Sequence, residues 1–283
     1  ELVTATSAVT IAGAPDLALG DLLGACVMNL MIVAVIDVID PSDGIFHRIG
    51  QGHVVSAAFG VLLLGITAIG LVAANNGIPL ALGHVSLISP AILVLYAVAI
   101  RTIYHFERRQ VAELLERGAE RYADVSLREA VIGYALAGLV VIAVGIALPF
   151  VGERIAEVMG WEQTFVGTLF LALATTVPEI VVTISAARLG AADMAIGNLL
   201  GSNLFDIAIL AIADLAMVSG PITSAASPLH AISAASAMMM SGVTIIACVY
   251  RPRRAVFQRA AWASVLLLSL YALNAYVLFR GAN

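Results

Sequence analysis

Eight apolar segments, each long enough to cross a lipid bilayer, follow one another along this chain and occupy most of it. A helix needs about 20 residues to span the hydrocarbon core. Of the 283 residues, 61% are hydrophobic and 12% charged, and the mean hydropathy is +1.02, which excludes an ordinary soluble domain. We therefore predict an all-α polytopic membrane protein with spans at 17–38, 54–74, 79–100, 130–151, 164–187, 194–217, 228–250 and 260–279, and a shorter apolar segment at 1–12.

The arginines orient these spans in the membrane. All fourteen basic residues are arginine, and placing the stretch 101–128 in the cytoplasm puts only Arg154 and Arg280 outside. The other twelve then lie inside: Arg48, the six from Arg101 to Arg128, Arg188, Arg251, Arg253, Arg254 and Arg259. Because cytoplasmic loops carry an excess of positive charge, we predict that loop 101–129 is cytoplasmic.

Two connecting stretches and the start of the chain complete this outline. The sequence NNGIP, 75–79, predicts a tight external turn between two spans. The hydrophilic stretch 106–130 contains Glu113 and Arg117 at helical spacing, so we expect a short surface helix there, which orients the chain or binds lipid head groups. Residue 1 opens an apolar run with no initiator methionine and no signal-peptide pattern, so we expect that an upstream part of the natural protein is absent.

An internal repeat divides the sequence. The segment that starts at Glu1 aligns with the segment that starts at Glu179, with one inserted residue between the helices. The paired positions are Glu1 and Glu179, Asp16 and Asp193, Gly20 and Gly197, Gly24 and Gly201, Asn29 and Asp206, and Asp37 and Asp214. Five membrane crossings separate the copies, so they have opposite orientations, as in many secondary transporters. We divide the single membrane domain into a first, incomplete repeat at 1–103, a connecting loop at 104–129 and a second repeat at 130–283.

Acidic residues within the spans indicate where the chemistry lies. Glu179 and Asp206 stand inside apolar runs with no basic residue, and a carboxylate at the bilayer centre costs at least ~2.5 to 3.5 kcal/mol. Pro178 should release the carbonyl of Ala174 from the helix ladder. The hydroxyls of Thr175 and Thr176 stand one turn before Glu179, and that of Ser202 one turn before Asp206. Together with Glu1 and Asn29 of the first repeat, they form the hard oxygen set that Ca²⁺ prefers and that Na⁺ also accepts.

Structural explanations compete with each of these assignments. The four glycines of GDLLG and GNLLG also fit close helix packing, and hydroxyls in membrane helices often bond their own backbone. Glu179 and Asp206 also fit protonated structural acids, and Asp37 and Asp214 either line a path or cap their helices. Five histidines, His47, His53, His84, His105 and His230, fall near segment ends, where interfacial placement explains them. Cys26 and Cys248 fit small packing residues.

The second repeat resembles a known transporter superfamily at these same residues. Its sequences ATTVPE, 174–179, and GNLLGSNLFD, 197–206, are similar to the T-S-x-P-E and G-N-x-x-G-S-N motifs of the calcium/cation antiporters. The resemblance implies an inverted-repeat exchanger with ten transmembrane helices, of which about nine are present here. It also implies the following ion ligands: Glu1, Asn29, Thr175, Thr176, Glu179, Ser202, Asp206 and the backbone of Ala172.

The function that this resemblance implies is exchange of Ca²⁺ for Na⁺ by a secondary antiporter, without an enzymatic reaction or a cofactor. Asn29 opposite Asp206 looks like the prokaryotic sodium/calcium branch, which implies the bacterial inner membrane, with the lipid bilayer and the ions as partners and no nucleic acid. A proton/cation antiporter, in which Glu179, Asp206 or Asp21 titrates, is the alternative. The first repeat has Ala25 and Cys26 where the motif has serine and asparagine, which keeps open a structural subunit that has lost transport.

Overall fold

Two buried apolar helices, α2 (Pro15–Ile39) and α8 (Ala192–Ala216), pack against each other at the centre of the structure. The computed structural model describes residues 1–39, 44–50, 52–78, 80–121, 126–251 and 261–281. Almost every residue of α2 from Leu17 to Asp37 is buried, including several that carry polar side chains. The larger hydrophobic core surrounds this pair of helices.

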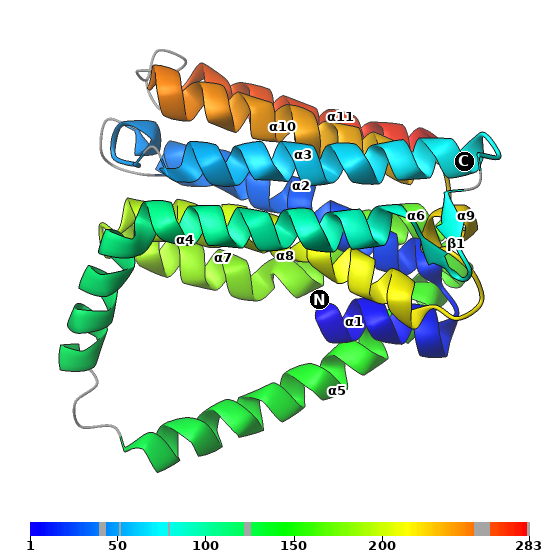
Figure 1. Cartoon of the computed structure of the whole chain (residues 1–283), viewed down its shortest axis with the longest axis horizontal. Helices are drawn as coiled ribbons and strands as arrows, with labels where there is room; N and C mark the ends of the chain where they lie inside the picture. The colour runs from blue at the N-terminus through cyan, green and yellow to red at the C-terminus, as the bar shows by residue number, and fades with distance from the viewer. Residues whose placement is uncertain (40–43, 51, 79, 122–125, 252–260, 282–283) are drawn as a thin grey trace.

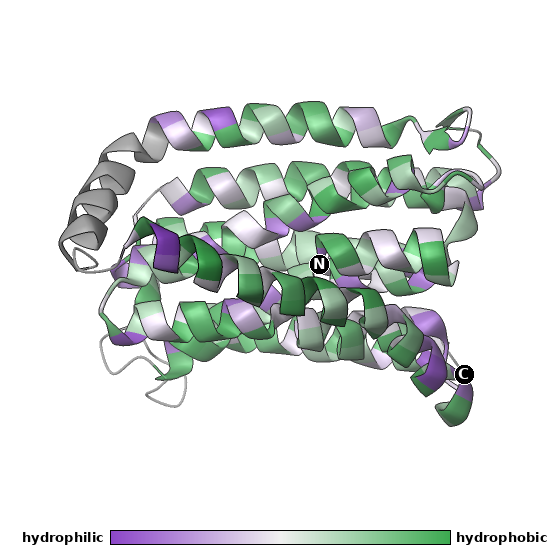
Figure 2. Ribbon diagram, turned by 90° about the horizontal axis from the view of Figure 1, so that it is seen from below, coloured by the Kyte–Doolittle hydropathy of each residue, from purple (hydrophilic) through white to green (hydrophobic). Residues whose placement is uncertain are grey.

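The described residues contain six further membrane-length helical segments, and all but α5 pack around the central pair (Figure 1). They are α3 (Gly52–Asn75), α4 (Ile88–Arg121), α5 (Leu127–Met159), α7 (Ala172–Arg188) with the segments before it, α10 (His230–Tyr250) and α11 (Trp262–Gly281). Within the described residues, eight helical segments have the length and apolarity to cross a membrane, and Leu2–Ala12 is a shorter apolar helix. Hydrophobic residues cover most of their length (Figure 2). The predicted all-α polytopic membrane fold is therefore confirmed.

Shorter elements connect these helices. They are α1 (Leu2–Ser7), the π-helical η1 (Ala8–Ala12), the 3₁₀ turn η2 (Ile45–His47), α6 (Gln163–Val166), the π-helical η3 (Gly167–Leu171) and α9 (Ile222–Ala225). The segments α6, η3 and α7 follow one another without a break, so they form one span.

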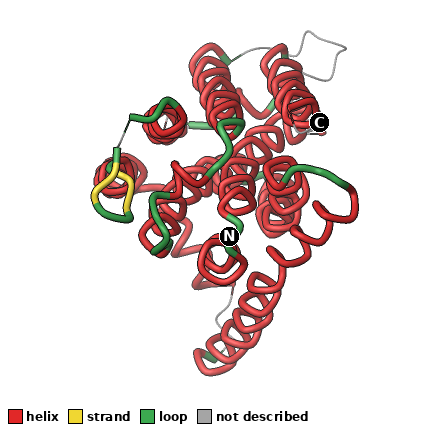
Figure 3. The backbone as a smooth tube through the Cα atoms, turned by 90° about the vertical axis from the view of Figure 1, so that its right-hand side faces the viewer, coloured by secondary structure: helices red, strands yellow, loops and turns green. Residues whose placement is uncertain are grey.

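The connection between α3 and α4 differs from the prediction. The chain turns at Asn76 and Gly77, within the predicted 75–79, and then adds an antiparallel hairpin of β1 (Ala81–Leu82) and β2 (Val85–Ser86), at the rim of the bundle in Figure 3. Gly77 and Gly83 adopt positive φ angles that break the helical path. The span predicted at 79–100 therefore begins at Ile88.

Helix α5 is longer than predicted at both ends. Its first turn carries a capping box, in which Ser126 and Glu129 bond each other's backbone, and it ends at Gly160, which has φ 67°. The helix runs obliquely away from the bundle (Figure 1), and most of its side chains are exposed. Helix α4 continues to Arg121, so the expected surface helix is its extension, while the pairing of Glu113 with Arg117 lies outside the described side chains.

Helices α2, α3 and α4 have counterparts in α8, α10 and α11, as the repeat predicts. Gly13 and Gly190, each just before the second helix of its copy, both adopt a left-handed conformation. The Arg48 side chain donates to the carbonyl of Gly190 at 2.9 Å, so two predicted cytoplasmic segments lie at the same face. Arg253, Arg254 and Arg259 lie outside the described residues, and the cytoplasmic assignment stays a prediction.

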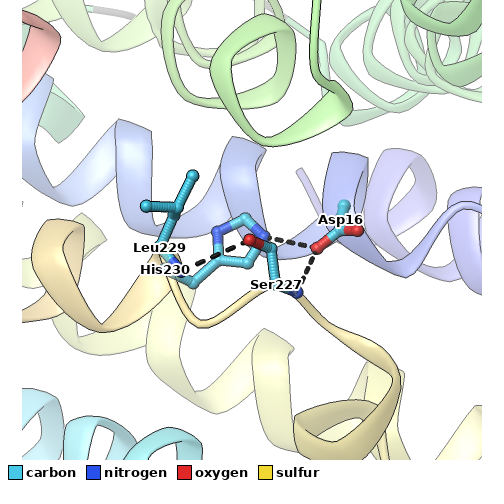
Figure 4. Close-up of polar contacts among 4 residues, drawn as sticks. All are labelled: Asp16, Ser227, Leu229 and His230. Carbon is cyan, nitrogen blue, oxygen red and sulfur yellow. Dashed lines mark hydrogen bonds and ion pairs between the residues drawn. The ribbon is translucent and has the colours of Figure 1, made fainter. Parts of the chain in front are cut away.

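Asp16 joins the start of α2 to the start of α10 (Figure 4). Its Oδ1 accepts a hydrogen bond of 2.6 Å from the Ser227 backbone N–H and lies 2.9 Å from His230 Nε2. Asp193 joins the start of α8 to the start of α3 in the same way. Its Oδ1 accepts a hydrogen bond of 2.6 Å from the Gly50 backbone N–H and lies 2.9 Å from His53 Nε2.

His53 and His230 are therefore buried partners of aspartates, and both lie in the first turn of their helices, α3 and α10, as predicted for residues near segment ends.

Asp37 joins the end of α2 to the start of α11. Its Oδ1 accepts from the Ile45 N–H at 3.2 Å, and its Oδ2 accepts from the Ala261 N–H at 3.0 Å and the Ser264 hydroxyl at 2.6 Å. A fully buried carboxylate that accepts three hydrogen bonds has its lone pairs satisfied inside the protein.

Asp214 makes the repeat-related joint between α8 and α4. Its Oδ1 accepts from the Ile222 N–H at 2.7 Å, and its Oδ2 accepts from the Ser86 N–H at 2.8 Å and the Ser89 hydroxyl at 2.5 Å. Of the two roles left open for Asp37 and Asp214, the structure favours helix anchoring.

Gly20 and Gly24 let α2 approach η3 at backbone distance. A Cβ on Gly20 would lie 2.9 Å from the Gly167 Cα, and one on Gly24 would overlap the Thr168 carbonyl oxygen. Their repeat counterparts face no such neighbour: a Cβ on Gly201 meets nothing within 4 Å. The close-packing explanation thus holds for the glycines of the first repeat.

We predict that Gly24→Ala lowers the unfolding temperature of the protein in detergent, whereas the repeat-matched Gly201→Ala does not. The new methyl group at position 24 must displace the backbone of η3, and overpacking of this kind costs about 1–3 kcal/mol. Alanine at position 201 meets open space and gains up to about 1 kcal/mol of helix propensity. Equal shifts in unfolding temperature for the two variants would contradict this packing.

Candidate cation site

The residues implied as ion ligands come from four helices, α1, α2, α7 and α8, which pack against one another. Glu1 caps α1, Asn29 lies on α2, Ala172, Thr175, Thr176 and Glu179 lie on α7, and Ser202 and Asp206 lie on α8. The π-helical η3 leads directly into Ala172, and π-helical turns are frequent at functional sites. Pro178 lies inside α7 one residue before Glu179. Because proline has no N–H, it cannot supply the usual helical donor to the carbonyl of Ala174.

Acidic groups gather where these elements meet. The side chains of Glu1, Glu179 and Asp21 all interact electrostatically with that of Asp206, which is fully buried. One carboxylate oxygen of each of the four is buried and has no hydrogen-bond donor among the described residues. No hydrogen bond or ion pair within the described part joins them to an arginine. These acids thus lack the partners that satisfy Asp37 and Asp214.

Threonine hydroxyls extend this oxygen set. Thr175 Oγ1 lies 2.7 Å from Asp21 Oδ1, 3.1 Å from the carbonyl oxygen of Leu171 and 3.3 Å from that of Ala172. A hydroxyl has one hydrogen and two lone pairs, so donation to Asp21 leaves the Thr175 oxygen able to bind a cation. The hydroxyl of Thr176 is fully buried and has no partner among the described residues, and Ser202 is half-buried one turn before Asp206.

Two side-chain contacts cross between the repeats at this level. Asn29 Nδ2 donates to Asn203 Oδ1 at 3.0 Å, and Asn203 Nδ2 donates to the Cys26 carbonyl at 3.3 Å. The Cys26 thiol lies 3.8 Å from Asp206 Oδ2. Cys26 and Asn203 occupy equivalent positions in the two copies, as do Asn29 and Asp206. The repeat therefore relates the contact between Asn29 and Asn203 to the contact between Asp206 and Cys26.

The gathered acids do not form a closed metal centre in this structure. Across the described residues, no three Asp, Glu, His or Cys side chains converge closely enough to hold a metal ion. A bound cation would therefore need hydroxyl and carbonyl oxygens as well, such as those of Thr175, Thr176 and Ala172. The ligand assignment itself stays a prediction.

Three further polar side chains lie at or beside this site and were not among the expected ligands. Asp21 bonds Thr175, Asn203 bridges α2 to α8, and the buried Thr168 hydroxyl has no partner within the described residues. Asp21 has a sequence signal, since it is an acid in an apolar run. Asn203 belongs to the GSN motif, whereas Thr168 carries no signal that separates it from an ordinary core threonine.

Two grooves at one end of the molecule lie apart from these acids. An apolar groove of about 620 Å³ is lined by Phe150, Val151, Arg154, Ile155, Val158, Met159, Trp161 and Phe170. A polar groove of about 410 Å³ is lined by residues that include Asp16, Glu153, Glu157 and Glu162. Neither contains a residue of the candidate cation site.

Comparisons with known proteins match both the sequence and the fold. A family model described as "Sodium/calcium exchanger protein" matches residues 129–280, which is more than half of the chain. A stretch of 60 residues is 48% identical to Sodium/calcium exchanger MaX1 of Methanosarcina acetivorans. That match covers 20% of this chain and 17% of the relative, well under two thirds of its length.

Two solved structures share the fold over nearly the whole chain. The sodium-calcium exchanger NCX_Mj, soaked without Na⁺ and Ca²⁺, superposes with a TM-score of 0.56 at 19% identity, covering 98% of this chain and 82% of that one. The H⁺/Ca²⁺ exchanger CAX superposes with a TM-score of 0.58 at 14% identity, covering 99% and 73%. At such identities the likeness is one of fold.

We predict that Asn203→Ala destabilises the protein more than Asn198→Ala does. The first change removes the hydrogen bonds to Asn29 and to the Cys26 carbonyl, while the second removes a single bond of 3.1 Å to Thr183 from a half-buried side chain. Hydrogen bonds between membrane helices contribute about 0.6 kcal/mol each on average, so Asn203→Ala should cost about 1 kcal/mol. Thermal unfolding in detergent measures the difference, and equal stability of the two variants would count against the bridge.

Proposed function

Because the chain belongs to the sodium/calcium exchanger protein family, we propose that it is a secondary antiporter that exchanges Ca²⁺ for Na⁺ across its membrane. The family match confirms the resemblance to the calcium/cation antiporters, and the helices make the chain an integral membrane protein. The membrane that this proposal assigns is the bacterial inner membrane, with loop 101–129 in the cytoplasm.

The observation that carries the proposal is the group of four acids where α1, α2, α7 and α8 meet, each of which has one buried carboxylate oxygen with no donor among the described residues. A buried carboxylate without a partner is strongly unfavourable, because burial removes its hydration and nothing replaces it. Bound cations would supply the missing charge, and the neighbouring hydroxyl and carbonyl oxygens would complete a hard-ligand shell for Ca²⁺. In this proposal Glu1, Glu179 and Asp206 supply the charge, and Asn29, Thr175, Thr176, Ser202 and the Ala172 carbonyl supply neutral ligands.

Exchange follows when two kinds of cation compete for one set of ligands. Empty acids of like charge repel one another, so the site is stable when either Ca²⁺ or Na⁺ fills it and unfavourable when it is empty. A site of this kind, exposed alternately to the two faces, couples the movement of one ion to the countermovement of the other. The gradient of the coupling ion then drives transport without ATP.

Calcium flux into proteoliposomes of the full-length protein tests this proposal. We expect Ca²⁺ uptake when Na⁺ is trapped inside and diluted outside, and loss of that uptake when choline replaces Na⁺. Uptake that depends on a proton gradient and ignores Na⁺ would assign the protein to proton/cation antiport instead. The transport hypothesis would be falsified if neither gradient moved Ca²⁺.

Glu179→Gln should reduce Na⁺-driven Ca²⁺ uptake by tenfold or more. The change removes one charged ligand and keeps the side-chain volume, and an interaction with a charged group contributes about 1.5–3 kcal/mol. The matched control is Glu157→Gln, which makes the same change in an exposed side chain that pairs with Arg154 at the end of α5. Equal uptake by the two variants would show that Glu179 does not bind the transported ion.

A further inference from the structure

Asp21 is fully buried on α2, and its two carboxylate oxygens have different surroundings. Its Oδ1 accepts the Thr175 hydroxyl at 2.7 Å, and its Oδ2 has no donor among the described residues. The side chain interacts electrostatically with those of Glu1 and Asp206. Asp21 is therefore part of the same group of acids, although it is not one of the ligands that the superfamily motif implies.

The repeat shows that this carboxylate is a departure from the sequence of the second copy. The position equivalent to Asp21 is Asn198, whose Nδ2 donates to Thr183 Oγ1 at 3.1 Å on the neighbouring helix of the same repeat. The position equivalent to Thr183 in the first repeat is Ala5, which has no hydroxyl. Asp21 thus lacks the local partner of its counterpart, and its hydroxyl partner comes from α7 of the other repeat.

The oxygens near Asp21 offer lone pairs that can bind a cation, whereas they repel a carboxylate that has no counter-charge. Thr175 gives its hydrogen to Asp21 and keeps its lone pairs, and the carbonyl oxygens of Leu171 and Ala172 lie within 3.3 Å of the same hydroxyl oxygen. These oxygens are too few for Ca²⁺, which takes six to eight. A monovalent cation carries the single positive charge that balances one carboxylate, so it matches Asp21 better than Ca²⁺ does.

We propose that Asp21 is an additional cation ligand that raises the negative charge of the transport site by one, so that the Na⁺-loaded site holds one more Na⁺ than it would with a neutral residue there. This inference rests on the proposed Na⁺/Ca²⁺ exchange. It assigns Asp21 to the stoichiometry of exchange, whereas Glu179 and Asp206 serve binding of either ion.

The test measures the Ca²⁺ gradient that a fixed Na⁺ gradient sustains. Proteoliposomes of the full-length protein hold a tenfold Na⁺ gradient with the membrane potential clamped at zero, and the limiting ratio of internal to external Ca²⁺ is recorded. Each coupled Na⁺ multiplies this ratio by ten. Asp21→Asn, which removes the charge and keeps the shape, should therefore lower the ratio about tenfold, while Glu157→Gln leaves it unchanged.

An unchanged limiting ratio in Asp21→Asn would overturn the inference, because asparagine mimics a carboxyl group that serves only as a neutral hydrogen-bonding residue. This failure is distinct from that of the proposed function, in which the wild-type protein itself sustains no Na⁺-driven Ca²⁺ gradient. Binding of ²²Na⁺ to the detergent-solubilised protein gives a second readout that needs no transport, with one Na⁺ fewer expected per Asp21→Asn molecule. If that variant does not fold, Asp21→Ser provides the same comparison with a neutral hydroxyl ligand.

Discussion

The bilayer requires every buried polar group to find its partner within the protein, and this constraint separates the acids of the structure into two classes. Asp37 and Asp214 are fully buried and accept three hydrogen bonds each. Asp21 and Asp206 are equally buried, yet each has an oxygen without a donor among the described residues. The acids of the first class stabilise the fold through hydrogen bonds from within the protein. The second class lacks donors for those oxygens among the described residues, and that deficit marks the candidate cation site.

The two repeats agree where the residues hold the scaffold together and differ where they surround the site. Aspartates at both ends of α2 and α8, with their serine or histidine donors, occur in both copies. Within α2 and α8, four pairs of positions with a polar side chain in at least one copy differ between the copies: Asp21 and Asn198, Ala25 and Ser202, Cys26 and Asn203, and Asn29 and Asp206. All four pairs lie on the middle turns of α2 or α8, near the acids. The scaffold of the inverted repeat is therefore symmetric, whereas the candidate cation site at its centre is asymmetric.

Sequence alone predicted the parts of this structure that depend on local composition. Apolar length predicts the spans, and the paired motifs predict that Glu179 and Asp206 face each other. The hairpin before α4 was missed because residues 79–87 are as apolar as a helix and differ from one mainly through the φ angles of Gly77 and Gly83. Most partners of Asp37 and Asp214 were missed because two of the three donors to each stand more than 100 residues away in the chain. Such pairings depend on how α2 and α8 cross, which no local pattern encodes.

The four anchoring aspartates also constrain how alternating access works in a chain of this fold. Asp16 and Asp37 of the first repeat hold the starts of α10 and α11 of the second, and Asp193 and Asp214 of the second hold the starts of α3 and α4 of the first. Each repeat is therefore fastened to the other at both ends of its central helix, and the two cannot rock as separate bodies without breaking these bonds. Among the described residues, helix α5 has no such joint to the rest of the bundle. Its buried residues are Gly145, Pro149, Gly152 and Ala156, and its polar link to α1 is one hydrogen bond of 3.2 Å from Ser7 to the Ile146 carbonyl. Gly20 and Gly24 have no side chains, so the surface of α2 that faces η3 has no projections. Helix α5 and the segments from α6 to α7 can therefore slide across the other helices, which the four aspartates hold together. This movement breaks fewer buried interactions than movement of one repeat against the other.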